Sequence, residues 1–159
     1  MIGSALLVSI FEWLEITNVA KEIRQSNWLY PFIEIIHIFG IVLVAGGAVM
    51  FDIQLISRST VISSSGTSSL LLWSKRGLIL AVPSGILLFI TNAVSLAANP
   101  FMTAKMLLLF VAGLNAYVFH LRAGYLRTNR ESTTTAKFHA VLSMLLWMAI
   151  IACGRLLAY

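Results

Sequence analysis

Four long apolar stretches constrain the fold of this chain more than any other feature. They run over residues 28–57, 78–98, 101–121 and 138–158. About 20 apolar residues in a helix cross the roughly 30 Å of hydrocarbon in a bilayer, and each stretch reaches that length. The chain is 59% hydrophobic and only 11% charged, whereas about a quarter of the residues in a soluble domain are charged. The sequence therefore predicts an all-α integral membrane four-helix bundle, formed as a single domain over residues 1–159.

The segment that precedes the first apolar stretch predicts an amphipathic interfacial helix over about residues 4–25. Apolar side chains recur there at helical spacing, and acidic and amide side chains fall on the other face. The apolar set is Leu6, Ile10, Trp13, Ile16, Ala20 and Ile23, and the polar set is Glu12, Glu15, Glu22 and Gln25. A helix this polar does not span a bilayer. It is expected to lie on the membrane surface or to dock against a partner protein, and the sequence leaves both interpretations open.

The basic residues predict the orientation of the four spans. Seven flank the loops after the first and third spans, and four lie towards the opposite side. The seven are Arg58, Lys75, Arg76, Arg122, Arg127, Arg130 and Lys137, and the four are Lys21, Arg24, Lys105 and Arg155. Cytoplasmic loops carry the excess of Lys and Arg, so both termini are expected outside. Despite the net charge of +5, no basic stripe with interleaved aromatics is present, which argues against a nucleic-acid partner.

An ionisable pair interrupts the first span in the sequence EIIHIFG, residues 34–40. Glu34 and His37 are three residues apart and share one helical face. Ionisable groups inside spanning helices are costly and usually mark a functional site in the bundle interior. At about 1.5 Å of rise per residue, Lys105 on the third span and Arg155 on the fourth are expected at the same outer level. The alternatives are hydrogen bonds to a neighbouring helix for the pair and snorkelling to the headgroups for the two cations.

A second polar level is expected near the cytoplasm, where His120 and His139 lie about equally far from the loop that joins them. Asp52 and Gln54 reach this level on the first span. His37 and His120 are candidate ligands of a haem iron, but the helical rise separates them by about 15–18 Å along the membrane normal. A haem would then bind to His37 alone, with an open sixth position, or to the pair His120 and His139. The helices that carry this pair are consecutive in the chain, so neighbouring helices would leave little room for a haem between them. Solvated roles at the interface are the alternative for that pair.

Small residues accompany these histidines on their helices. One face of the first span holds His37, Gly40, Val44 and Gly47, and the third span places Leu109, Gly113, Ala116 and His120 near the Lys105 face. Small residues let two helices approach closely, and they leave the same room for a flat macrocycle. The pattern therefore fits helix packing and a haem pocket alike. In the second span, Pro83 and Gly85 predict a kink.

Other chemistries lack support in the sequence. The single cysteine, Cys153, excludes an internal disulfide and a thiolate cluster. No Ser-His-Asp, HExxH, Walker or CxxC pattern is present. The six methionines are scattered and do not form the close pairs with histidine that a copper path requires.

Three segments carry a resemblance to a known family: IEIIHIFGIVLVAGG, AKMLLLFVAGLNAYVFH and the terminal CGRLLAY. From about Trp28 to the C-terminus, and in the stretch WLEITNVAKEIRQSNWLYP, the chain resembles a bacterial family of four-helix membrane proteins of unknown function. That family is distantly similar to the HemJ-type protoporphyrinogen oxidases and the CopD-type copper-resistance membrane proteins. HemJ-type proteins carry a histidine early in one helix and a lysine in a later apolar helix, and they bind haem b. The resemblance implies that His37 and Lys105 are the matching positions and that the chain lies in a bacterial inner (plasma) membrane.

Together these features predict a haem b-binding membrane protein of electron transfer or of small-molecule or porphyrin oxidation. Such a protein, if it is an enzyme, is a membrane oxidoreductase. The predicted axial ligand or proton-handling residue is His37, with Glu34 as its orienting partner. Carboxylates of a haem or porphyrin are expected to pair with Lys105 and Arg155. The two histidines of the cytoplasmic level are the secondary ligand candidates.

Two further functions fit the same sequence. The first is a non-catalytic subunit that anchors or stabilises a larger membrane complex, built with other membrane subunits or with further copies of the chain. In that case the amphipathic N-terminus docks the partner, and the polar levels are interhelical hydrogen bonds. The second is copper transport.

Overall fold

The computed structural model of the protein describes residues 2–57, 64–126 and 132–157. All regular structure in these ranges is helical, which confirms the prediction of an all-α fold. The helices are α1 (Ile2–Glu15), α2 (Asn18–Gln25), α3 (Leu29–Ser57), α4 (Ser64–Thr91), α5 (Ala93–Ala98), α6 (Pro100–Leu126) and α7 (Ser132–Leu156). Of the residues used above for orientation, Arg58, Arg127 and Arg130 lie outside the described ranges.

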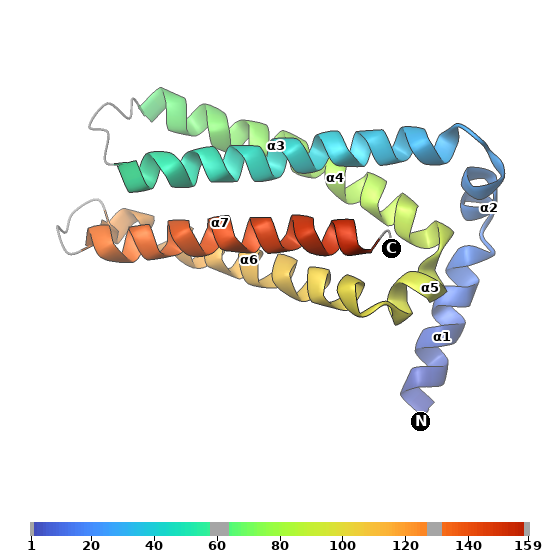
Figure 1. Ribbon diagram of the computed structural model, residues 1–159. Coiled ribbons are helices and arrows are strands. Elements are labelled where there is room, and N and C mark those ends of the chain that lie inside the picture. Colours follow the sequence, from blue (N-terminus) through green and yellow to red (C-terminus); the bar gives the residue numbers. More distant parts are fainter. Residues whose placement is uncertain (1, 58–63, 127–131, 158–159) are drawn as a thin grey trace.

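Four of these helices are long and apolar enough to cross a membrane. The apolar segments are Leu29–Ser57 in α3, Leu72–Thr91 in α4, Pro100–Leu121 in α6 and Thr134–Leu156 in α7. The four helices run lengthwise beside one another (Figure 1). Large apolar side chains point away from the protein, with Phe39 64% exposed, Ile79 71% and Phe110 71%. Exposed apolar surface of this extent is unfavourable in water, and in a bilayer it meets lipid. The chain is therefore a multi-pass helical membrane protein.

The four spans form two hairpins that meet along one contact. Helix α3 packs along α4, α6 packs along α7, and α3 packs against α7. Helices α4 and α6 do not pack against each other over their described residues. The order across the bundle is therefore α4, α3, α7, α6. The two hairpins meet mainly where α3 packs against α7, and the rings of Phe51 on α3 and Phe119 on α6 add an edge-to-face contact, with centroids 5.8 Å apart.

Glycines set the close approach of α3 and α4. A Cβ added at Gly40 would lie 2.6 Å from the backbone nitrogen of Ala81. At Gly77 on α4, a Cβ would lie 2.8 Å from the carbonyl oxygen of Gly40. Only hydrogen fits at these points, so the two backbones touch directly, as small residues allow in membrane helices. One turn further, the Ser74 hydroxyl donates a hydrogen bond to the Val44 carbonyl at 3.3 Å.

The second span ends earlier than the sequence indicated. The prediction placed it over residues 78–98, whereas α4 runs from Ser64 to Thr91 and a separate short helix, α5, follows. The break falls at Asn92, whose φ of −142° and ψ of 45° are not helical. Thr91 is fully buried, and its hydroxyl donates to the Leu88 carbonyl at 2.7 Å. This local side-chain hydrogen bond competes with continuation of the helix, and α4 ends at this residue.

The N-terminal segment forms two helices where one was predicted. Thr17 ends the first and caps the second, because its hydroxyl accepts a hydrogen bond from the Ala20 amide at 3.4 Å. Serine and threonine favour this N-cap position. Helices α1, α2 and α5 all lie at one end of the bundle, close to the C-terminal end of α7 (Figure 1). We call this the α5 end, and the end that holds Ser57 and Ser132 the opposite end.

Contacts from α1 fasten it to the α5 end. The Glu15 carboxylate accepts a hydrogen bond from the Val94 amide at 2.9 Å, in the first turn of α5. The ring of Phe11 meets the ring of Phe89 on α4 edge to face, with centroids 5.9 Å apart. Trp13 remains 62% exposed. The helix is thus anchored through its acidic residue and one aromatic, while a second aromatic stays available to a membrane surface or a partner.

Candidate functional site

The imidazole of His37 is held in place by α4. Its Nδ1 lies 2.9 Å from the Ala81 carbonyl oxygen and 3.1 Å from the Ser84 hydroxyl. A carbonyl only accepts hydrogen bonds, so Nδ1 carries the proton that it donates to Ala81. The neutral ring then has an unprotonated Nε2. Histidines that bind a metal through one nitrogen typically donate the other N–H to a backbone carbonyl in this manner.

Three consecutive residues of α4 lie where the ring of His37 packs. Pro83 lies inside the helix and has no N–H to donate to the turn before it. Ser84 is buried, and its hydroxyl donates to the carbonyls of Leu80 and Ala81. At Gly85, a Cβ would lie 2.8 Å from Cε1 of His37. The sequence marked Pro83 and Gly85 as a kink, but their fit to His37 becomes visible only when α3 and α4 are paired.

The small-residue face of α3 is used for helix packing. Gly40 and Val44 are buried, and Gly40 meets Ala81 as described above. A Cβ at Gly47 would lie 3.2 Å from the Leu70 carbonyl oxygen. Of the two interpretations that the sequence left open for this face, the structure shows packing, and a macrocycle does not fit between α3 and α4 at these glycines.

Lys105 brings a positive charge from the second hairpin towards His37. Its Nζ lies against α7, where a Cβ at Gly154 would be 3.5 Å away. The lysine is half-buried, it neighbours Cys153, and it is near enough to His37 for the two groups to interact electrostatically. The structure thus brings His37 and Lys105 to one region at the α5 end.

Glu34 and Arg155 lie at the same end with less direct roles. Glu34 is exposed one turn before His37, and its charge acts on that histidine. The orienting hydrogen bonds of the imidazole come from α4, where the sequence analysis expected them from Glu34. Arg155 is in the last turn of α7 and is exposed.

His139 belongs to a separate polar cluster nearer the opposite end. Its Nδ1 is 2.6 Å from Asn115 Oδ1, and Asn115 Nδ2 donates to the His139 carbonyl at 3.1 Å. The Asn115 amide therefore bridges α6 to α7. The ring of Phe119 lies against His139, with centroids 6.2 Å apart. His120 is exposed on the outer side of α6, so the structure does not turn His120 and His139 towards a common ligand.

The two ends of the bundle separate the candidate iron ligands. Lys105, which acts on His37, and His120 are fifteen residues apart on α6, or about 22 Å of helix. His37 therefore lies at a different level of the bundle from His120 and His139. Within the part of the chain that the structure describes, no three His, Cys, Asp or Glu side chains come together as a metal site.

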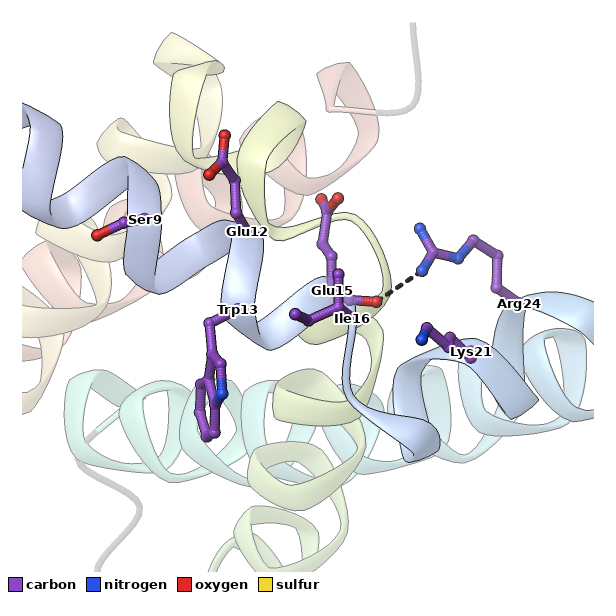
Figure 2. A pocket seen from close by; sticks show the side chains of 7 residues that line it. All are labelled: Ser9, Glu12, Trp13, Glu15, Ile16, Lys21 and Arg24. Atoms are coloured by element: carbon purple, nitrogen blue, oxygen red, sulfur yellow. Dashed lines mark hydrogen bonds between the residues drawn. The ribbon is translucent and has the colours of Figure 1, made fainter.

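An open pocket lies at the bend between α1 and α2. Its lining is Ser9, Glu12, Trp13, Glu15, Ile16, Lys21 and Arg24, and Figure 2 shows the Arg24 guanidinium donating to the Glu15 carbonyl, at 2.7 Å. Two carboxylates and two cations share this lining, so their charges balance. The pocket is widely open, and it offers no strong charge selectivity.

The fold defines the class of this protein as an all-α, multi-pass membrane protein with one histidine fixed by a proline-containing helix. Comparison of the chain with protein-family models, with curated proteins and with solved structures finds no match to any of them. The region around His37 and Lys105 is the strongest candidate for a functional site.

Proposed function

We propose that the protein binds one haem b within the bilayer through His37 and acts in electron transfer or in oxidation of a small molecule or porphyrin. One observation carries the proposal: Nδ1 of His37 donates its hydrogen bond to the Ala81 carbonyl. This bond fixes the ring and leaves Nε2 unprotonated, with a lone pair that can bind a metal ion. A bound haem supplies one-electron chemistry, and its axial ligand and burial tune the potential. Of the described residues, His37 is the one that would hold the haem iron.

The surroundings of His37 suit the other groups of a haem. Lys105 is a half-buried cation whose charge already acts on His37, and a propionate would neutralise it. Because α3 and α4 are closed by Gly40 and Gly47, the macrocycle would lie on the side of His37 that faces α6. Arg155 at the same end adds a second cation. The resemblance to HemJ-type proteins, which matches His37 and Lys105, supports the same assignment.

We assign the protein to the bacterial inner membrane with the α5 end outside. The support for the orientation is the distribution of basic residues in the sequence: seven flank the loops after the first and third spans, whereas four, Lys21, Arg24, Lys105 and Arg155, lie towards the α5 end. The bacterial inner membrane is what the family resemblance implies. In this orientation His37 and Lys105 lie in the outer half of the bilayer.

An absorption spectrum of the purified protein tests the haem proposal. We expect a Soret band in the oxidised protein that shifts on reduction, after purification from cells supplied with a haem precursor. His37→Ala should abolish or displace this band, because the axial nitrogen is lost. His120→Ala is the matched control and should leave the spectrum unchanged, since His120 is exposed on α6. A protein without a Soret band after haem supplementation, or a His37→Ala variant with the spectrum of the parent, would contradict the proposal.

A second candidate function is that of a non-catalytic subunit, and α6 favours it. Over its described residues, helix α6 packs along α7 and against α5, and it meets α3 through the ring pair Phe119 and Phe51. A Cβ at Gly113 would have open space around it, and Leu109 and Ala116 are exposed nearby. Small residues on an uncovered membrane helix suit contact with another helix. Isolation in mild detergent followed by native mass spectrometry tests this function: a partner or a second copy is expected, and a lone chain would contradict it.

A further inference from the structure

Asp52 is a buried carboxyl group that the proposed haem site does not use. It lies on α3 near the opposite end of the bundle and is only 5% exposed. The hydroxyl of Ser143, on α7, donates a hydrogen bond to it. Its second oxygen, Oδ2, is completely buried and has no hydrogen-bond partner among the described residues. Asp52 thus lies where α3 of the first hairpin packs against α7 of the second. One carboxyl oxygen accepts a hydrogen bond, and the other has no partner among the described residues.

Basic groups on the neighbouring helices do not neutralise this carboxyl. The charged residues of α4 are Lys75 and Arg76, which are both exposed, and the Arg76 guanidinium stacks on Trp73 at 5.1 Å. On α7, Lys137 lies more than a turn before Ser143, and His139 is engaged with Asn115. The remaining ionisable residues of these helices lie at the α5 end: Cys153 and Arg155 on α7, and Lys21, Glu22 and Arg24 on α2.

An ionised carboxylate in this position would be costly, because a charge taken out of water needs a partner. A metal cation is a poor candidate for that partner, since hard cations take six or more oxygens and only Ser143 accompanies Asp52 here. A proton, by contrast, needs a single oxygen, and Oδ2 provides it. The water-facing end of α3 is near: Ser57 is five residues away, or about 7.5 Å of helix.

We propose that Asp52 is a proton-binding site, held as a neutral carboxylic acid in mildly acidic solution and exchanging its proton with water at the opposite end of the bundle. Binding transfers a proton from hydronium to Oδ2 and releases water, and the reverse step returns the carboxylate. The Ser143 hydroxyl positions the carboxyl group by its hydrogen bond to the other oxygen. This inference is independent of the haem proposal, because His37 and Lys105 take no part in it.

Isotope-edited infrared spectroscopy tests the proposal without any substitution, because Asp52 is the only aspartate in the chain. The full-length protein is made by cell-free synthesis with aspartate carrying 13C in its side-chain carboxyl, and it is then reconstituted in lipid. In mildly acidic solution we expect a carbonyl stretching band of a protonated carboxylic acid that moves between the 12C and 13C samples. In D2O the same band should shift, since the exchangeable proton is replaced. A spectrum with only carboxylate bands from the label, or a band that D2O leaves unmoved, would overturn the proposal.

Two variants sharpen this test. Asp52→Asn keeps the shape of the side chain and should remove the acid band, while Ser143→Ala should keep the band and shift its frequency, because one hydrogen bond is lost. Glu34→Gln is the matched control, since Glu34 is an exposed carboxyl on the same helix, and it should leave the band unchanged. An acid band that persists in Asp52→Asn would assign the proton to another group and so contradict the proposal. Isotope labelling of the unaltered protein remains decisive if a variant fails to fold.

Discussion

The imidazole of His37 occupies the space that a side chain at Gly85 would fill, with Cε1 only 2.8 Å from the position of the absent Cβ. The ring cannot swing away without breaking its hydrogen bonds to Ala81 and Ser84. Gly85 of α4, which has no side chain, therefore leaves the space that the ring of His37 on α3 occupies.

Gly85→Ala is expected to displace His37. The added methyl group overlaps the ring, and the two hydrogen bonds at Nδ1 are lost or lengthened, which should cost about 1–3 kcal/mol of stability. Thermal unfolding in detergent measures the loss, and 15N NMR of labelled histidine reports the change at the ring. Gly46→Ala is the control, since a Cβ there meets nothing within 4 Å; it should be neutral or stabilising by up to about 1 kcal/mol. Equal stability of the two variants would contradict the fit.

Gly40→Ala is expected to be more damaging than Gly85→Ala. Its Cβ would meet backbone atoms of Ala81 at 2.6 and 2.8 Å, and a backbone cannot move aside as a side chain does. The α3–α4 pair must separate along its length, at a cost of at least about 3 kcal/mol, the upper part of the range for overpacking. The midpoint of thermal unfolding should fall accordingly, and the ranking of Gly40→Ala, Gly85→Ala and Gly46→Ala is the decisive readout.

Asn115→Ala is expected to loosen α6 from α7. The Nδ1–H of His139 loses its partner, and a polar group left unpaired away from water costs about 1–3 kcal/mol. The His139 carbonyl loses its second hydrogen bond. Unfolding in a denaturing detergent titration measures the change. As a comparison on the same helix, His120→Ala is expected within about 0.5 kcal/mol of the parent, because the side chain is exposed. If Asn115→Ala proved equally harmless, the bridge would have no energetic role.

Glu15→Ala is expected to release α1 from the α5 end while leaving the four spans intact. The Val94 amide loses its acceptor, a change comparable to the removal of a helix N-cap, at about 0.5–2 kcal/mol. Hydrogen exchange at Val94 should accelerate, whereas exchange within α3 should not change. Glu12→Ala removes a neighbouring exposed carboxylate and should leave both rates unaltered. Protection of Val94 that survives Glu15→Ala would show that other contacts fasten α1.

The sequence predicts the four spans because the bilayer imposes their length and hydropathy on any chain that crosses it. The sequence does not predict the contacts of the His37 ring with α4, because these contacts depend on which face of α3 packs on α4. Before α3 and α4 are paired, Pro83, Ser84 and Gly85 indicate only a kink.

Local breaks are the other feature that the sequence analysis missed. Thr17 is a residue type that favours an N-cap, and the signal was readable, but the regular apolar spacing around it favoured one continuous helix. At Thr91 and Asn92 the break depends on burial of a hydroxyl that bonds back to Leu88. Hydropathy remains high through α5, so composition carries no mark of this turn.

The packing of α3 against α7 has a consequence for how the protein assembles. Helices α3 and α4 are adjacent in the chain, as are α6 and α7, so each pair closes a short loop at a small entropic cost. The joining contact between α3 and α7 links residues about as far apart as the chain allows: Asp52 and Ser143 are ninety-one positions apart. Long-range contacts of this kind form late. The first hairpin is complete before the last helix has been synthesised, and the meeting of the first and last spans is the step that finishes the molecule.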